Sequence, residues 1–398
     1  MRITTVLLPA AALALARQGT VIASKPSHTR NGLTWTDNAL RMNEIQVVGT
    51  HNSYHVEADP KEQAEMKFIG KDEMKFRYSH PALDVQLGQR HVRSIELDIH
   101  ADPGGGNYAR PVIREKARLP FPSDPVFATN STKVLHVPDF DVGSVCADLV
   151  QCLRMVQRWV VAHPRAVPIP ILLEFTTAHP LGKFLGGTEV IAWNNTVLLD
   201  WVDAEIRSVF PREQMIVPDD LRRDELPTLE KAVLQRGWPD LESARGRVLF
   251  LMVNGPMHPV RSAYIKNRPN LEGRVIFTNA APGNADCVFQ KLNEPTSENA
   301  IAHIQKQVAA GYLVRTRADV PLDEVLKKRC DVRRRDSALR SGAQIVSTDF
   351  PVYGPSERWG CEYAVMLPGG KAARCNVASG APSCDDALLE PDEYTRKE

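Results

Sequence analysis

Short runs of apolar, often β-branched residues alternate with longer amphipathic stretches along most of the chain. The apolar runs predict eight strands, at residues 45–49, 92–99, 133–137, 169–175, 248–253, 275–278, 313–316 and 344–347. Helical spacing is found between them, at residues 145–163, 193–209, 228–236, 298–310 and 322–329. The sixth strand has the weakest pattern, and residues 215–218 are an alternative to it. Strands that alternate with helices predict an α/β protein with a parallel sheet.

Two parallel architectures fit this order, a closed (β/α)8 barrel of the TIM type and an open doubly wound sheet. An open dinucleotide-binding sheet would carry Gly-x-Gly-x-x-Gly after its first strand, and this chain does not. Polar residues recur instead at the ends of strands, as they do at the rim of a barrel. We therefore predict one TIM-type barrel over residues 35–360, followed by a short Cys-containing extension, residues 361–398.

The N-terminal residues predict export from the cell. Arg2 is followed by an apolar run that ends at Ala16 and then by small residues, so residues 1–23 are predicted to be a signal peptide, cleaved after Ala16 or Ala23. A buried N-terminal helix is the alternative. The run is too short to cross a bilayer and no later segment is long enough. We expect a secreted, extracellular protein without a transmembrane segment.

Cysteine usage agrees with an oxidising compartment. Cys146 and Cys152 lie close together before a predicted helix. Three more cysteines crowd a Gly/Pro-rich tail, where disulfides would substitute for a missing core: Cys361, Cys375 and Cys384. Because the chain has 7 cysteines, we expect at least one free thiol in the set that includes Cys287 and Cys330.

The charge balance excludes some classes of partner. The chain has 49 Lys and Arg against 48 Asp and Glu and no sustained basic patch, which argues against a nucleic-acid partner. Hydrophobic residues make up 43%, enough for a large core, and we expect a monomer. Asn130 and Asn194 are possible N-glycosylation acceptors.

Polar side chains mark the ends of four successive predicted strands. In chain order these residues are His51 and Asn52, Glu96 and Asp98, His136, and Glu174. Period-2 geometry places Glu96, Asp98 and His100 on one face of their strand, where two carboxylates repel each other unless a cation or protons intervene. Each piece alone has an ordinary structural explanation. Together they predict a site, because the strand ends of a barrel converge on one rim.

The oxygen atoms of this set predict a calcium site. Asn52, Glu96, Asp98 and Glu174 would supply the all-oxygen ligands that Ca²⁺ prefers, with substrate and water completing the shell. The absence of cysteine ligands, and histidines reserved for catalysis, argue against zinc.

In this order the motifs resemble the catalytic barrel of phosphoinositide-specific phospholipases C, most closely the small secreted calcium-dependent group of the PLC-like phosphodiesterase superfamily. The matching segments are GTHNSYH (49–55), RSIELDIH (93–100), KVLHVPDFD (133–141) and HPRAVPIPILLEF (163–175), with weaker support from residues 245–254 and 344–351. The resemblance covers roughly residues 40–355. Calcium-independent relatives use an arginine where the cation sits, so the acidic residues here favour the calcium-dependent branch.

The resemblance also implies roles for these residues. Asn52, Glu96, Asp98 and Glu174 would hold Ca²⁺, His51 would stabilise the phosphorane or shuttle its proton, and His136 would be the general acid. These are the roles expected for cleavage of a phosphoinositol lipid at a membrane surface. The inositol 2-hydroxyl would attack phosphorus, giving a cyclic inositol phosphate and diacylglycerol.

Three questions stay open at this point. The general base could be Glu96, Glu174 or His51. Arg93 is a candidate for the cation that offsets the excess negative charge of the site. Three further residues stay outside the core set: His55, His100 and Asp349.

Other functions also fit parts of the pattern. A glycerophosphodiester phosphodiesterase or a phospholipid D-type lyase shares the barrel and an acidic metal pair, but usually has a His-Arg pairing where this chain has His51 and Asn52. A secreted barrel that binds lipid or glycan without turnover is a third possibility.

Overall fold

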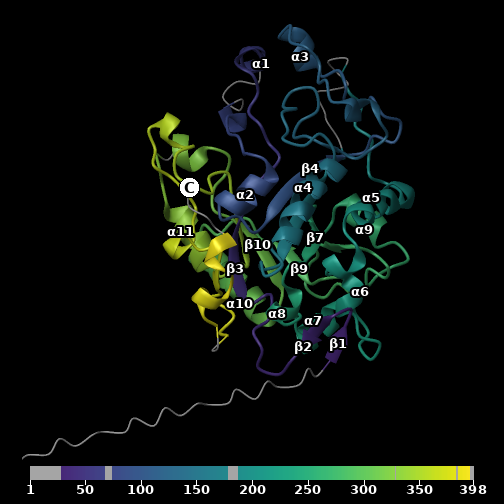
Figure 1. Cartoon of the computed structure of the whole chain (residues 1–398), viewed down its shortest axis with the longest axis vertical. Helices are drawn as coiled ribbons and strands as arrows, with labels where there is room; N and C mark the ends of the chain where they lie inside the picture. The colour runs from purple at the N-terminus through teal and green to yellow at the C-terminus, as the bar shows by residue number, and fades with distance from the viewer. Residues whose placement is uncertain (1–27, 68–73, 178–186, 328, 382–383, 395–398) are drawn as a thin grey trace, which may run out of the picture.

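The computed structural model describes residues 28–67, 74–177, 187–327, 329–381 and 384–394, so the predicted signal peptide lies outside the described residues. Eight short, buried, parallel strands form the centre of the molecule (Figure 1). They are β3 (Ile45–Thr50), β4 (Ile95–His100), β6 (Ile169–Phe175), β7 (Val248–Met252), β8 (Ile276–Thr278), β9 (Phe289–Lys291), β10 (Leu313–Arg317) and β11 (Ile345–Thr348).

The strands form two parallel groups, β3-β11-β10-β9 and β4-β6-β7-β8. Single parallel bridges join the groups at both edges, Gly49 with Ser94 and Asn279 with Phe289. A Cβ atom on Gly49 would lie 2.7 Å from Cβ of Ser94, so glycine allows β3 and β4 to approach closely. The order is that of an eight-stranded ring, and the predicted TIM-type α/β fold class is confirmed.

Two details of the strand prediction are wrong. Residues 133–137 were expected to form the third barrel strand, but β5 (Lys133–Val134) is a two-residue strand that pairs antiparallel with β4. The missing barrel strand is β9, which is too short to give a period-2 signal between its flanking loops. Residues 215–218 do not replace β8, since Met215 makes only an isolated bridge to Val248.

Amphipathic helices cover the outside of the strands. The helices are α1 (Pro60–Met66), α2 (Leu83–Gln89), α3 (Val112–Lys116), α4 (Leu149–Ala162), α5 (Thr196–Val209), α6 (Pro218–Leu221), α7 (Leu229–Arg236), α8 (Leu241–Ala244), α9 (Pro259–Tyr264), α10 (Glu298–Ala310) and α11 (Arg333–Arg340). The long ones begin at side-chain caps: Asp148 accepts from the Gln151 amide and Ser297 from the Ala300 amide. Such caps explain why α4 and α10 agree closely with the predicted helices.

The two ends of the barrel carry different structures. Excursions that contain α1 and α3 follow β3 and β4 and project beyond the carboxyl ends of the strands (Figure 1). The antiparallel hairpin of β1 (His28–Arg30) and β2 (Leu33–Trp35) lies at the opposite end, where Thr34 bonds the Asp240 carboxylate. The excursions therefore lie on the side of the barrel where the strands end.

The C-terminal segment packs against the amino-terminal end of the barrel. The strand β12 (Ala373–Cys375) pairs antiparallel with β3. Both Glu390 oxygens accept from Nε of Arg93, at 3.0 and 2.9 Å, and Oε1 also accepts from the Val167 amide at 2.9 Å. Arg93 is fully buried and stacks over the Trp159 ring at 4.7 Å. Arg93 therefore lies far from the strand ends that carry the proposed ligands, and its prediction as the compensating cation is wrong.

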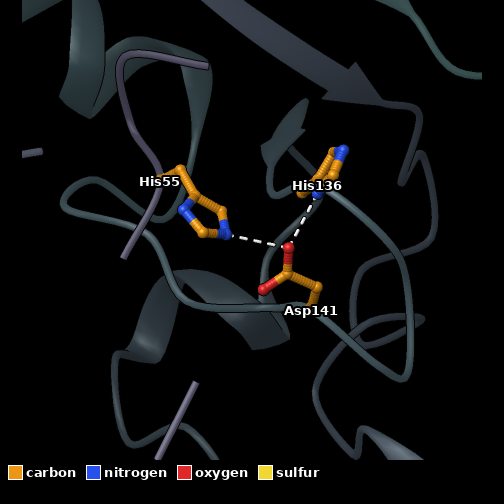
Figure 2. A group of neighbouring side chains, drawn as sticks. All are labelled: His55, His136 and Asp141. Atoms are coloured by element: carbon orange, nitrogen blue, oxygen red, sulfur yellow. Dashed lines mark hydrogen bonds and ion pairs between the residues drawn. The ribbon is translucent and has the colours of Figure 1, made fainter. Parts of the chain in front are cut away.

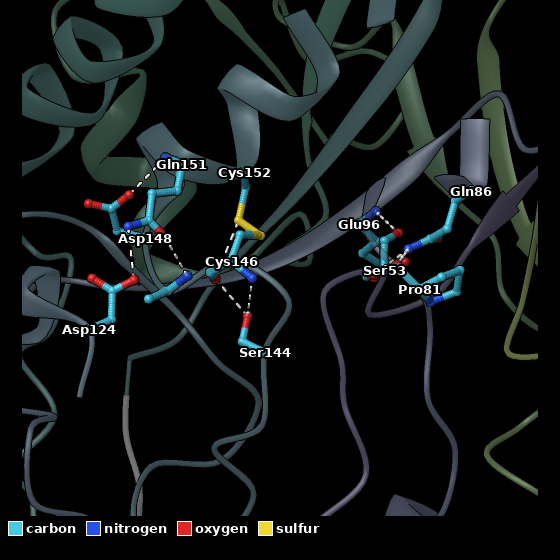
Figure 3. Close-up of a disulfide and its surroundings, with 11 residues drawn as sticks. Ser53, Pro81, Gln86, Glu96, Asp124, Ser144, Cys146, Asp148, Gln151 and Cys152 are labelled. Carbon is cyan, nitrogen blue, oxygen red and sulfur yellow. Dashed lines mark hydrogen bonds between the residues drawn. A yellow bond between two sulfur atoms is a disulfide. The ribbon is translucent and has the colours of Figure 1, made fainter. Parts of the chain in front are cut away.

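Three disulfides join Cys146 with Cys152, Cys330 with Cys361, and Cys375 with Cys384. The first ties the chain before α4 to its first turn, and Ser144 donates to the Cys146 carbonyl at 2.7 Å (Figure 3). Cys287 is free and buried, which confirms that one thiol of the predicted set is unpaired. Among the described residues, we find no helix long and apolar enough to cross a bilayer.

Candidate functional site

Two carboxylates meet at the carboxyl ends of neighbouring strands. Asp98 on β4 and Glu174 on β6 are register partners. Asp98 is buried, whereas the Glu174 side chain is 45% exposed and its Oε2 lies 3.7 Å from Nζ of Lys291. The alternation of β4 explains the placement, because Ile95, Leu97 and Ile99 take the other face and pack in the hydrophobic core.

The turn after β3 places Asn52 beside these strands. The Ser53 amide donates to the Glu96 carbonyl at 2.8 Å, and the Glu96 amide donates to Oγ of Ser53 at 2.8 Å. Gln86 supports the same turn by donating to the Ser53 carbonyl at 2.7 Å (Figure 3). Asn52 itself has a φ of 44°, a left-handed conformation that asparagine adopts more easily than most residues.

The oxygens of the site carry negative charge that the protein only partly offsets. Burial raises the pKa of Asp98 well above its usual range, and the charge of Glu174 adds to that rise. Oδ1 of Asp98 and Nδ2 of Asn52 are buried and have no hydrogen-bond partner among the described residues. An all-oxygen set with an unsatisfied carboxylate fits a hard cation such as Ca²⁺.

Glu96 differs from the other proposed ligands. Its Oε2 forms a buried ion pair with Arg315 of β10, and Arg315 also donates to Oγ of Ser347 at 3.0 Å. Burial alone would raise the pKa of Glu96, but Arg315 holds it below the usual value. Glu96 is therefore ionised, and one of its oxygens is already occupied.

Cations of the site come from the second half of the barrel. Arg315 pairs with Glu96, Lys291 lies beside Glu174, and Nη2 of Arg317 lies 3.3 Å from Asp349. These three residues, and not Arg93, offset the negative charge of the site.

His51 is held by a carboxylate that directly follows the last barrel strand. Its Nδ1 lies 2.8 Å from Oδ1 of Asp349, and its amide donates to the Thr348 carbonyl at 2.9 Å. Burial lowers the pKa of His51 well below the usual value, and the positive charge of Arg317 lowers it further. The ring is therefore neutral near pH 7, and Nε2 has no partner among the described residues.

The Asp319 carboxylate holds Asp349 in the position from which it contacts His51. Oδ1 of Asp319 accepts from the Asp349 amide at 3.0 Å, and its Oδ2 accepts from the Thr348 hydroxyl. Burial raises the pKa of Asp319 to about 7, helped by the adjacent charge of Asp349. Asp349 is thus fixed in place by its own backbone amide.

His136 reaches the site because β5 runs antiparallel to β4. The chain after Val134 turns back alongside β4, and the His136 ring is influenced by the charges of Asp98 and Glu174. Nδ1 of His136 lies 2.7 Å from Oδ2 of Asp141 (Figure 2). Burial would lower the pKa of His136, but the hydrogen bond and charge of Asp141 raise it overall.

The structure gathers all six predicted residues at one end of the barrel. It also adds five that were not in the predicted core set: Asp141, Lys291, Arg315, Arg317 and Asp349. The position of Asp349 directly after a predicted strand is a usable signal, whereas Asp141 lies in a loop, and its only signal is its place in the matching segment 133–141. His100 belongs elsewhere, since its Nε2 bonds the Leu135 carbonyl at 2.9 Å and its ring packs on Tyr108.

Comparisons with known proteins identify the family and support the fold. The family model of calcium-dependent phosphoinositide phospholipase C matches residues 40–377. The apo form of a calcium-dependent phosphoinositol-specific phospholipase C from Pseudomonas sp. is 16% identical, with a TM-score of 0.50 over 84% of this chain and 95% of that chain. A myoinositol complex of the Pseudomonas enzyme gives a TM-score of 0.50 at 16% identity, over 87% of this chain and 99% of that one.

The calcium-dependent phosphatidylinositol-specific phospholipase C of Streptomyces antibioticus is 18% identical, with a TM-score of 0.47 over 79% of this chain and 96% of that chain. None of the curated protein sequences matches this chain significantly. At these identities the Pseudomonas structures support the fold, and the family assignment rests on the model that spans most of the sequence. The chain belongs to the calcium-dependent phosphoinositide phospholipase C family, whose members are enzymes that cleave a phosphodiester bond with calcium as cofactor.

Proposed function

We propose that this enzyme cleaves phosphatidylinositol, or a related phosphoinositol compound, through attack of the inositol 2-hydroxyl on phosphorus. The products are a cyclic inositol phosphate and diacylglycerol. One observation carries the proposal: two imidazoles at the same end of the barrel are each held through Nδ1 by their own aspartate, His51 by Asp349 and His136 by Asp141. The pKa of His51 is lowered and that of His136 is raised, which suits a base and an acid that work in one reaction.

His51 is the proposed general base. Asp349 accepts the Nδ1 proton, so Nε2 carries the lone pair that can take the proton of the 2-hydroxyl. Glu96 is a poorer base, because Arg315 occupies one oxygen and lowers its pKa. Glu174 remains the alternative among the candidates from the sequence.

His136 is the proposed general acid. The Asp141 carboxylate stabilises its imidazolium, and the 23% exposure of the side chain gives the leaving group access to Nε2. The proton passes from Nε2 to the diacylglycerol oxygen as the bond from phosphorus to that oxygen breaks. After both transfers His51 is protonated and His136 is neutral, and a solvent proton exchange restores the starting state.

Asn52, Glu96, Asp98 and Glu174 would hold the calcium ion. When bound, Ca²⁺ would lower the pKa of the attacking hydroxyl and offset charge that develops on the phosphoryl oxygens. Arg315 fixes the Glu96 carboxylate, and the register pairing of Asp98 with Glu174 keeps the other two carboxylates together. These side chains are thus positioned before the ion arrives.

The setting we propose is an extracellular membrane surface. Three disulfides fit an oxidising compartment, in line with the proposed signal peptide at residues 1–23. Met257 after β7 is 93% exposed and Tyr353 after β11 is 54% exposed, so both follow carboxyl ends of strands. We propose that these two side chains touch the lipid, and that the barrel over residues 35–360 acts as a monomer with the 361–398 segment attached.

Phosphorus NMR of the products tests the proposal. Phosphatidylinositol incubated with enzyme and calcium should give a five-membered cyclic phosphate, and EDTA should abolish the product. A linear inositol phosphate as first product would reject attack by the 2-hydroxyl. Release of a glycerophosphate species would favour a glycerophosphodiester phosphodiesterase instead.

A further inference from the structure

A second cluster of potential metal ligands lies beside the general acid. His55, His136 and Asp141 place one ligand atom each within 4.8 Å of one another (Figure 2). Nε2 of His55 lies 2.8 Å from Oδ2 of Asp141, and Nδ1 of His136 lies 2.7 Å from the same oxygen. One carboxylate oxygen is therefore shared by two imidazoles.

The proton arrangement of His55 is fixed by its second contact. Its Nδ1 lies 2.9 Å from the Tyr78 carbonyl, which can only accept, so Nδ1 carries a proton. Its Nε2 also faces an acceptor, the Asp141 carboxylate, so a further proton must lie between those two atoms. A cation that binds the Nε2 lone pair would replace this proton. A histidine whose other nitrogen donates to a backbone carbonyl is the usual arrangement of a metal ligand.

The local backbone holds the three side chains in place. Val137 and Asp141 exchange two backbone hydrogen bonds, at 3.0 and 2.9 Å, and this tight turn directs Asp141 back toward His136. His55 forms a bridge with Ser144, and its ring stacks on Tyr78 at 4.3 Å. His55 and Asp141 are fully buried and His136 is half-buried, so a fourth coordination position would open on the His136 side.

The ligand types select the metal. Two imidazole nitrogens and one carboxylate oxygen suit Zn²⁺, whereas Ca²⁺ prefers the all-oxygen set at Asp98 and Glu174. Zinc bonds of about 2.0 Å place tetrahedral ligands about 3.3 Å apart. To reach this spacing, each imidazole nitrogen would move away from the Asp141 oxygen by about 0.5 Å.

We propose that His55, His136 and Asp141 form a Zn²⁺ site that inhibits the enzyme. Zinc bound there takes the place of the Nδ1 proton of His136, so the ring can no longer become an imidazolium and its Nε2–H is a much weaker acid, while the calcium ligands stay free. The inhibition rests on the proposed function of His136 as general acid, but the binding does not.

Calorimetry with zinc chloride, on the full chain saturated with calcium chloride, tests the site directly. We expect one Zn²⁺ per chain and the release of at least one proton, visible when buffers of different ionisation enthalpy are compared. His55→Gln should weaken binding by about tenfold or more. His303→Gln, at an exposed position on α10, is the matched control and should bind zinc as the wild type does. Unchanged affinity in His55→Gln, or displacement of zinc by excess calcium, would overturn the proposal.

Cobalt spectroscopy on the wild type covers the case in which the variant does not fold. Co²⁺ should give the intense visible absorption of a tetrahedral site, and zinc should quench it. A weak octahedral spectrum would overturn the proposed site. Zinc binding through His55 without phospholipase activity would reject only the proposed function, whereas activity with no zinc bound would reject only this inference.

Discussion

Asp98 and Glu174 stand opposite each other in register on two neighbouring parallel strands, so their carboxylates lie side by side at the mouth of the barrel. Burial and this neighbour raise the pKa of Asp98 well above its usual range. In the absence of a cation the two groups repel each other. The repulsion between Asp98 and Glu174 therefore affects both the affinity for the metal and the stability of the protein without it.

Asp98→Asn tests this pairing. The variant should need at least about tenfold more calcium for half-maximal activity, because it lacks one ligand charge. Without calcium it should melt at a higher temperature than the wild type, since the repulsion with Glu174 is gone. Thermal melts with calcium and with EDTA check both expectations, and Asp336→Asn on the exposed face of α11 serves as control. An unchanged calcium titration would remove Asp98 from the site.

His136→Ala tests the general acid. Turnover should fall by about 10²–10⁴-fold, the usual contribution of acid–base catalysis, while calcium affinity stays near that of the wild type. Steady-state kinetics on phosphatidylinositol and calcium calorimetry check the two halves of the prediction. His303→Ala, at an exposed position, should have no effect on either. Normal turnover of His136→Ala would assign the acid to another residue.

Asp319→Asn tests the raised pKa of Asp319, which hydrogen-bonds the Asp349 amide. The folded-state pKa of Asp319 is raised to about 7, above its unfolded value, so its stabilising contribution is complete at low pH and is lost as pH rises through about 7. Each unit of this rise corresponds to about 1.4 kcal/mol. The difference in melting temperature between Asp319→Asn and the wild type should therefore shift in favour of the variant as the pH rises from 5 to 8. A difference that stays constant with pH would contradict the assignment.

Glu390→Gln tests the anchor of the C-terminal segment. It leaves the buried Arg93 guanidinium without its anion, which typically costs about 3–5 kcal/mol of unfolding free energy. Urea unfolding measures that loss, and turnover at low temperature should stay normal because Arg93 lies at the opposite end of the barrel. The double variant Arg93→Met, Glu390→Leu should recover most of the stability. Equal stability of Glu390→Gln and the wild type would show that the pair contributes little.

The barrel could be predicted where hydrophobic strands are long. The residues of β3, β4, β6 and β7 form unbroken apolar runs or clear alternations, and each agrees with a predicted strand to within a few residues. The three residues of β9 carry no such pattern, so only hydrogen bonds to β10 identify that strand. The direction of β5 could not be predicted either, because pairing direction leaves no trace in two residues.

In the candidate site, too, residues with a local sequence signal could be predicted and long-range contacts could not. Residues at strand ends, such as Asn52 and Glu174, could be found because barrel geometry brings those ends together. The contact between His51 and Asp349 joins residues 298 positions apart, and the pair of Arg315 with Glu96 joins residues 219 apart. A single sequence does not reveal such contacts, since they depend on how the ring of strands closes.

The pairing of β3 with both β11 and β12 has a consequence for the order of folding events. During synthesis β3 emerges among the first elements of the barrel, and both of its partners emerge among the last. Until they arrive, β3 presents an unpaired hydrogen-bonding edge, which is a template for aggregation. The first strand of the barrel is therefore the last to complete its pairing, and a chain that ends before residue 345 would lack both partners of β3.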